Sequence, residues 1–243
     1  MTDEMDNTWS ADHLRVSLFS NVVWSTTAED IFSNVFGSPP ETITNKPAAN
    51  EASAVGSWDG LRLEVKRAFN RIDFVVQAVP SEIEPMPLIK DVKLVLPKFS
   101  SRIARWGSTQ PQGVVRIALG CNALLLSQNI EDSYVKLRDL IKVIDIDVGR
   151  FKEFRFQVNL PKTSSVSPDI TINRLSNWTS IALRAAVLGI AAPQFFDDKN
   201  YVSCSLDVNT DGERTQPITG NLVEKLTEEL SLICIDVLDV GIS

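Results

Sequence analysis

One segment of the chain has a helical period strong enough to constrain the whole fold. When residues 88–106 are placed on a helix at about 100° per residue, seven of their large apolar side chains fall within an arc of about 100°. These side chains are Leu88, Val92, Val95, Leu96, Phe99, Ile103 and Trp106. The basic residues of the segment lie outside that arc: Lys90, Lys93, Lys98, Arg102 and Arg105. The pattern predicts a helix that buries one side in a core, with Pro97 as the place of a kink or of a second helix start.

Alternation of apolar and polar residues predicts strands on both sides of this helix. The clearest are 61–68 and 72–79, joined as a hairpin by Asn70 and Arg71. Other strands are predicted at 13–24, 114–126, 154–160, 170–174 and 201–209, while 179–188 fits a strand or a helix. Further helices are predicted over 28–36, capped by Thr27, from 132 or 133 to 141, and after a capping box of Asn221 and Glu224.

The order of these elements predicts an α+β fold, with a mainly antiparallel sheet and helices packed on one face. Residues 1–12 are expected to be a mobile acidic tail, and residues 13–243 a single domain. The halves 13–106 and 113–240 share a rough layout, which suggests a pseudo-twofold duplication. Residues 38–57, rich in proline and small polar residues, predict a long loop that is either functional or disordered.

Composition and charge narrow the class of protein. The chain has 243 residues, of which 44% are hydrophobic and 23% charged, so it is neither a fibrous nor a wholly disordered chain. A net charge of −7 argues against nonspecific attraction to nucleic acid or anionic membranes. No apolar run approaches the ~20 residues of a membrane span. We therefore expect a cytoplasmic protein without membrane contact, whose Cys121, Cys204 and Cys234 are buried thiols.

The sequence contains none of the common catalytic or nucleotide-binding motifs. His13 is the single histidine and lies at the start of a predicted strand, which leaves little room for histidine-dependent catalysis. Asp169, Asp197 and Lys199 have the bare form of a Mg²⁺-dependent nuclease or phosphoryl hydrolase site, in which two acids hold the metal. The simpler interpretation is that residues 197–200 form a solvated turn.

A second acidic set offers a possible cation site. Asp145 and Asp147 lie on the same side of any strand, and Asp207 can join them from a neighbouring strand. Acids on the wet face of a sheet are the simpler interpretation here. The sequence thus leans away from an enzyme and indicates no cofactor.

Three segments of the C-terminal half carry a resemblance to known proteins. They are the strand 115–120 (VRIALG), the segment 172–178 (INRLSNW), and 205–208 (SLDV) followed by an amphipathic helix and the end 241–243 (GIS). Together they resemble a sporadically distributed family of uncharacterised bacterial proteins. The resemblance covers about the last 130 residues. It implies a bacterial origin and an α+β fold, but it carries over no functional residue, because no catalytic motif is established for that family.

Charge segregation supports the leading functional hypothesis. The segment 88–116 has a net charge of +5, whereas the predicted C-terminal helix is acidic. A solvated helix face is the simpler interpretation of such a basic stripe. We expect a protein-interaction or assembly subunit without catalysis that docks through its basic helix face, either onto itself or onto another protein. Trp9 and Trp58, in polar stretches, are candidate interface anchors, and the simpler interpretation is that each packs over the edge of the core. The alternatives are the Mg²⁺-dependent hydrolase and a nucleic-acid-binding module that uses 88–116.

Overall fold

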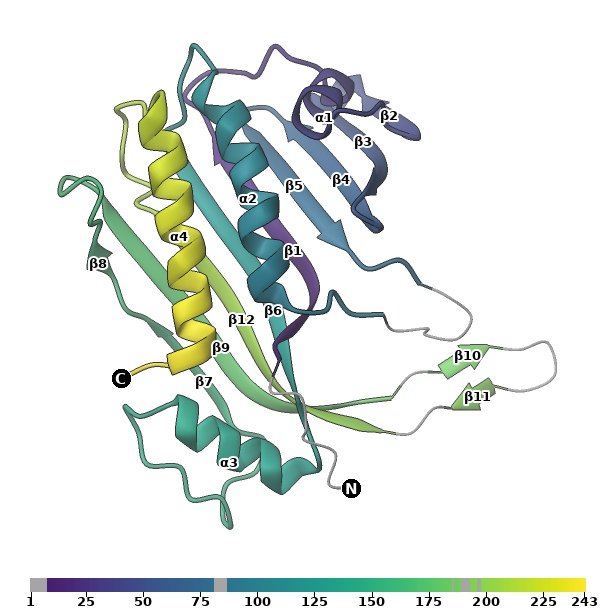
Figure 1. Ribbon diagram of the computed structural model, residues 1–243, viewed down its shortest axis with the longest axis vertical. Helices are drawn as coiled ribbons and strands as arrows, with labels where there is room; N and C mark the ends of the chain where they lie inside the picture. Colours follow the sequence, from purple (N-terminus) through teal and green to yellow (C-terminus); the bar gives the residue numbers. More distant parts are fainter. Residues whose placement is uncertain (1–7, 81–86, 185, 189–192, 196–197) are drawn as a thin grey trace.

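The computed structural model describes residues 8–80, 87–184, 186–188, 193–195 and 198–243. In these residues the chain forms one large antiparallel sheet with helices on one face, which confirms the α+β fold (Figure 1). The first half contains, in order, β1 (Ser10–Phe19), α1 (Ala28–Phe36), β2 (Thr42–Lys46), a 3-10 turn (Pro47–Ala49), β3 (Glu51–Trp58), β4 (Leu61–Ala68), β5 (Arg71–Gln77) and α2 (Val92–Ser108).

The second half repeats the layout of the first. It contains β6 (Arg116–Ser127), α3 (Ile130–Leu140), β7 (Arg155–Asn159), β8 (Lys162–Thr163), β9 (Thr171–Leu183), β10 (Ala186–Leu188), β11 (Pro193–Phe195), β12 (Lys199–Thr210) and α4 (Asn221–Val240). Each half starts with a strand and a short helix, continues with antiparallel strands, and ends with a long helix. β10 and β11 pair with each other as a separate ribbon.

The sheet joins the two halves at its centre. Its strand order is β2-β3-β4-β5-β1-β6-β12-β9-β7, with β8 also paired to β9. β1 and β6, the first strands of the two halves, pair antiparallel, with Leu14 opposite Cys121 and Leu18 opposite Ile117. The last strand of each half, β5 or β12, flanks this central pair. The duplication expected from the sequence therefore has a counterpart in the topology.

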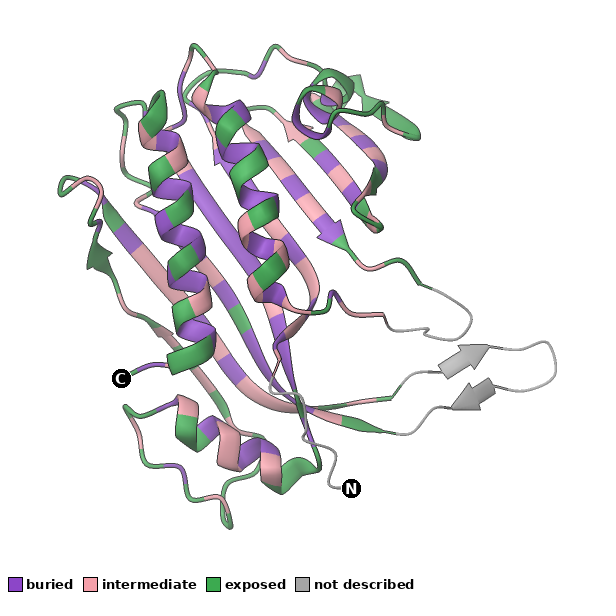
Figure 2. Ribbon diagram, viewed as in Figure 1, coloured by how far each residue is buried: buried purple, intermediate pink, exposed green. Residues whose placement is uncertain are grey.

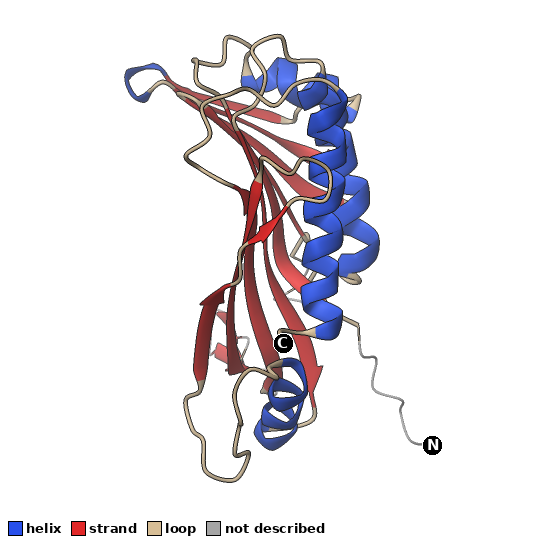
Figure 3. Cartoon of the chain, turned by 90° about the vertical axis from the view of Figure 1, so that its left-hand side faces the viewer, coloured by secondary structure: helices blue, strands red, loops and turns tan. Residues whose placement is uncertain are grey.

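The core lies between the sheet and the two long helices. α2 and α4 run side by side over the middle of the sheet, and Figure 3 shows them on one face of it. Leu14, Val16 and Leu18 of β1 are fully buried. Figure 2 shows buried residues along the central strands of the sheet and along α2 and α4. Burial of alternate strand residues against helices is the expected source of most of the stabilisation. In the described part of the chain, no helix covers the opposite face of the sheet (Figure 3).

The prediction of a loop over 38–57 is wrong, because this segment contains β2 and β3. Ala52, Ala54 and Gly56 alternate along β3 and face α1. A Cβ atom at Gly56 would lie 2.8 Å from the Phe32 ring of α1, so the backbone of β3 approaches the helix closely. The small residues that resemble a loop in the sequence are instead the contact surface of a strand.

Several predicted boundaries also need correction. Residues 10–12, assigned to the tail, belong to β1, while residues 1–7 lie outside the described residues. The two predicted strands at 170–174 and 179–188 are one strand, β9, up to Leu183, and 186–188 form β10. Asn221 is the first residue of α4 and no side chain caps that helix, so the capping box does not form. None of the helices in the described part combines the length and apolarity needed to span a membrane.

Candidate docking face

Helix α2 starts later than the sequence indicates. It begins at Val92, and the side chain of Asp91 caps it by accepting a hydrogen bond from the backbone of Leu94 (3.3 Å). Leu88 and Lys90 therefore precede the helix. The apolar side is as expected, since Val92, Phe99 and Ile103 are fully buried. Their burial fixes which side of α2 faces the solvent.

α2 packs against α4 in an antiparallel arrangement. At one end Lys93 forms an ion pair with Asp239. At the other end the Ser108 hydroxyl donates to Glu224 Oε1 (2.8 Å). A Cβ atom at Gly107 would lie 3.3 Å from Val223, so the missing side chain allows the helices to approach. Lys93 is thus already neutralised within the chain.

The exposed side of α2 carries three cations, which we call the α2 cationic face: Lys98, Arg102 and Arg105. All three side chains are exposed. At about 100° per residue they fall within an arc of about 60°, so they point the same way. Among the described residues, none of the three has a carboxylate within the 4.0 Å of an ion pair. Of the five basic residues expected to form one face, three share this arrangement, because Lys90 lies before the helix and Lys93 is paired.

Hollows lie on both sides of the α2 cationic face. The groove between α2 and α4 has a volume of about 500 Å³, and its lining includes Lys98 and Arg105 opposite Glu224 and Glu228. Between α2 and the turn after β3, a second hollow of about 520 Å³ is lined by Lys98, Arg102, Arg105, Trp58, Asp59 and Ser101. The cations therefore stand between two depressions in the surface, a shape that admits side chains of a partner.

The residues of the proposed hydrolase site do not assemble in the described structure. Asp169 precedes β9, whereas Lys199 pairs with Leu183 at the other end of that strand, about 40 Å away at ~3.3 Å per residue. Asp169 is exposed, and hydrogen bonds from the Ser167 hydroxyl and from Arg214 lower its pKa to about 2. Asp197 lies outside the described residues. Asp169 thus has a structural ion pair and no catalytic neighbour among these residues.

The second acidic set is also dispersed. Asp145 and Asp147 lie in the loop after α3, where Asp147 accepts a hydrogen bond from the backbone of Gly149 (3.1 Å). Asp207 lies on β12 and faces Arg15 across Gly120, with 3.7 Å between the charged groups. Within the described residues no cluster of three or more histidine, cysteine or acidic side chains is placed to hold a metal ion. Asp145 and Asp147 do not lie in a strand, so the alternation of side chains along a strand does not bring them to one side with Asp207.

The three cysteines are buried and unpaired, as expected. Burial raises the pKa of the Cys121 thiol to about 12, and the charge of Asp12 adds to this effect. Burial likewise raises the pKa of Cys204 and Cys234. The thiols are therefore protonated at neutral pH and are poor nucleophiles.

Comparisons with known proteins give no relative. No protein-family model matches the chain, and neither a comparison with curated proteins nor one with solved structures found a match. The resemblance of the C-terminal half to a bacterial family therefore stays a prediction.

The structure adds residues that the sequence did not single out. Leu94 on α2 and Leu232 on α4 are large apolar side chains with 61% and 59% exposure. Leu232 lines the groove between the two helices. Both leucines interrupt helix surfaces that are otherwise charged. An apolar residue at a position that periodicity assigns to the solvent is the pattern by which the sequence could have indicated them.

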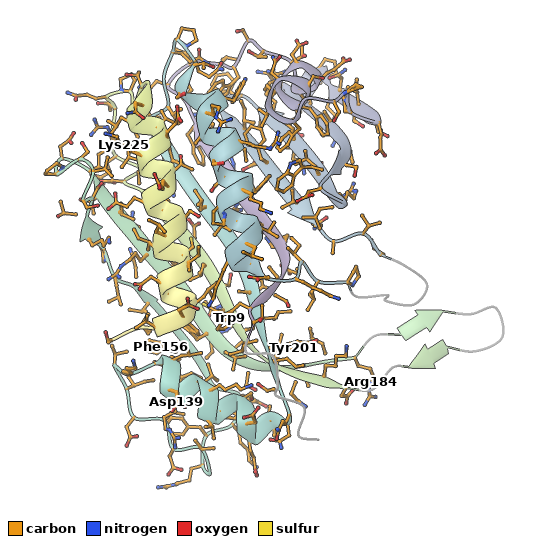
Figure 4. The ribbon with its side chains drawn as sticks, viewed as in Figure 1. Trp9, Asp139, Phe156, Arg184, Tyr201 and Lys225 are labelled. Atoms are coloured by element: carbon orange, nitrogen blue, oxygen red, sulfur yellow. The ribbon has the colours of Figure 1, made fainter. Side chains whose placement is uncertain are left out.

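Both tryptophans proposed as anchors are placed by the structure. Trp9 is buried, and its indole N–H donates to the carbonyl of Leu238 (2.7 Å), so it fastens the N-terminal strand to α4 (Figure 4). Trp58 is half-buried, and its ring centroid lies 5.5 Å from that of Phe99 beneath α2. Only Trp58 borders the hollow beside the α2 cationic face.

Proposed function

We propose that this protein is a docking subunit that binds a carboxylate-bearing protein surface through the α2 cationic face. The observation that carries this proposal is that Lys98, Arg102 and Arg105 share one exposed side without a carboxylate partner in the described residues. Surplus positive charge on a chain with net charge −7 attracts a complementary acidic surface.

The surroundings of these cations favour a protein partner. Trp58 offers an aromatic surface at one side of them, and Leu232 offers an apolar one at the other. Protein interfaces combine such apolar anchors with a charged rim. Trp106, the aromatic residue nearest the end of α2, packs inward against Trp24 with 5.8 Å between ring centroids. The aromatic residues of α2 itself, Phe99 and Trp106, are both buried, so this helix presents no exposed ring on which a base could stack, as bases do in single-stranded nucleic-acid binders.

Arg116 does not contribute to this face, although it adds to the net charge of 88–116. It pairs with Phe19 across the β1–β6 register, and its guanidinium lies 5.2 Å from the Phe19 ring centroid. Phe19 follows the buried residue Leu18 in β1, and successive side chains of a strand point to opposite faces of the sheet. Phe19 and its partner Arg116 therefore lie on the sheet face away from α2. The basic segment is therefore divided between two surfaces.

The proposal is tested with an acidic probe of defined chemistry. A fluorescein-labelled polyglutamate peptide is titrated with the protein at low salt, and binding is followed by fluorescence anisotropy. We expect the triple variant K98E/R102E/R105E to bind about tenfold more weakly, because three attractive contacts become repulsive. Binding to the unmodified protein weakens as salt is added.

A matched variant controls for the change in net charge. K142E/R150E/K152E reverses three exposed cations in the loop after α3 and is expected to bind the probe like the unmodified protein. Equal weakening by both triple variants would show attraction to the whole chain and would refute a specific face. Circular dichroism of all three proteins verifies that the fold is retained.

A further inference from the structure

The outer surface of α4 complements that of α2 in charge. At about 100° per residue, Glu228, Leu232 and Asp236 fall within an arc of about 80°. All three are exposed. Lys225 shares this side, near the start of the helix (Figure 4). The two helices thus present a basic stripe and a mainly acidic stripe on the same face of the molecule.

The ends of the helix pair fix the levels at which the two stripes lie. Lys93 contacts Asp239, and Ser108 contacts Glu224. Because the helices are antiparallel, a residue of α2 and a residue of α4 lie at the same height along the pair when their numbers add up to 332. Arg105 is therefore level with the turn that contains Glu228, and Lys98 is within a turn of Asp236. Leu232 is level with the small residues Ser100 and Ser101 of α2.

We infer that the partner of this face is a second copy of the same chain, seated with its α2 over α4 and its α4 over α2. This inference rests on the proposed docking function and names the occupant. A two-fold axis in the interface and parallel to the helices brings Arg105 to Glu228 of the other copy, and Lys98 to Asp236. The same contacts then form twice, as an isologous interface requires.

The charge pattern selects this axis over the other one that lies in the interface. An axis perpendicular to the helices would place α2 over α2 and bring Lys98, Arg102 and Arg105 against the same cations of the second copy. Like charges at such short range repel. The axis parallel to the helices also brings Leu232 over Pro97 and Ser101 of the other copy, and Leu94 toward Val240, so that exposed apolar side chains are covered.

The area of the proposed interface predicts a weak association between the two copies. α2 has 17 residues. A 25 Å helix pair about 20 Å wide covers about 500 Å² on each copy, or roughly 1,000 Å² in all. That area is at the lower limit of specific interfaces, so we expect a weak dimer whose formation depends on salt.

The inference is tested by sedimentation velocity of two charge-reversed variants, alone and mixed. The α2-reversed variant is K98E/R105E, and the α4-reversed variant is E228R/D236R. Each alone opposes like charges across the interface and is expected to remain a monomer. Mixed, the two variants restore opposite charges at all four sites and are expected to associate into a species of twice the 26.9 kDa chain mass.

The outcomes of this experiment distinguish a dimer through α2 and α4, a dimer through another surface, and a different acidic partner. An unmodified protein that stays monomeric up to roughly 1 mM at low salt would overturn the dimer. A dimer that both variants retain would place the interface elsewhere, and variants that stay apart when mixed would refute the seating of α2 over α4. If dimerisation fails while the polyglutamate probe still binds and still depends on Lys98, Arg102 and Arg105, the proposed docking function stands and the partner is another acidic protein.

Discussion

The three cysteines are buried, as the sequence predicts, and their burial determines how their thiols react. Cys121 and Cys204 project from β6 and β12 into the layer under α4, where Cys234 also lies. We predict that none of the three thiols reacts with a thiol-specific reagent such as Ellman's reagent in the native protein at pH 8, because burial keeps them protonated. All three are expected to react in guanidinium chloride. Rapid labelling of the native protein would show that the layer is open.

Glu229 is a residue whose role the sequence does not reveal. Its helical spacing groups it with the outward acids of α4, yet it is 7% exposed. Its carboxylate accepts hydrogen bonds from the Ser164 hydroxyl (2.5 Å), the Ser165 backbone (2.7 Å) and the Ser165 hydroxyl (2.8 Å). Burial opposes ionisation of this group, but these hydrogen bonds outweigh it and lower the pKa of Glu229. A helical wheel cannot show this, because Ser164 and Ser165 lie 65 and 64 residues before Glu229 in the sequence.

The lowered pKa predicts how Glu229 affects stability as pH changes. Since the folded state favours the charged form, the stabilisation is present above the unfolded pKa of about 4.3 and is lost as pH falls through the lower folded pKa. We predict that E229Q reduces the free energy of unfolding by about 2 kcal/mol at pH 7. The difference between variant and unmodified protein should shrink below pH 4.

Urea unfolding at several pH values measures this effect. E213Q, at an exposed turn residue, is the control, and its change is expected to stay within about 0.5 kcal/mol. A deficit of E229Q that is the same at pH 3 and pH 7 would contradict the role assigned to the ionised carboxylate.

The periodicity of the sequence predicts helices and strands well where local residues determine their bounds. It fails where a contact with a distant part of the chain determines the element. The helix 28–36 is found as predicted, since Thr27 accepts a hydrogen bond from the backbone of Asp30 (3.1 Å) and Gly37 ends it with a φ of 79°. These signals are local. The sequence does not indicate β3, because the residues that alternate along it are small instead of large and apolar. Small residues are needed there because α1 packs directly on the strand. Periodicity predicts the exposure of Lys98, Arg102 and Arg105 on α2, but it cannot show that Lys93 pairs with Asp239 of the distant helix α4.

The close approach of α1 and β3 gives a testable prediction at this scale. G56V places methyl groups where a Cβ atom already lies 2.8 Å from Phe32 and 3.4 Å from the backbone of Glu41. Overpacking of this kind is expected to cost about 2 kcal/mol of unfolding free energy. G149A, in a loop where the nearest atom lies 3.6 Å from the added Cβ, is the matched control and should change stability little. Thermal unfolding followed by circular dichroism compares the two, and equal stabilities would refute the packing argument.

The whole molecule consists of two similar halves joined along β1 and β6, and this arrangement explains the paired helices. Each half ends in a long helix, so joining the halves places α2 and α4 next to each other over the centre of the sheet (Figure 1). The halves differ in the charge of that helix. The result is one surface with adjacent basic and acidic stripes, which neither half would have alone.

Acetylation of lysines measures directly whether an acidic partner covers the exposed side of α2, as we propose. The protein is treated briefly with an acetylating reagent with and without a saturating amount of the polyglutamate peptide, and modification is quantified at each lysine by mass spectrometry. The account predicts that the peptide protects Lys98 severalfold, while Lys152 in the distant loop reacts as before. Lys98 that is acetylated equally fast with the peptide bound would contradict it.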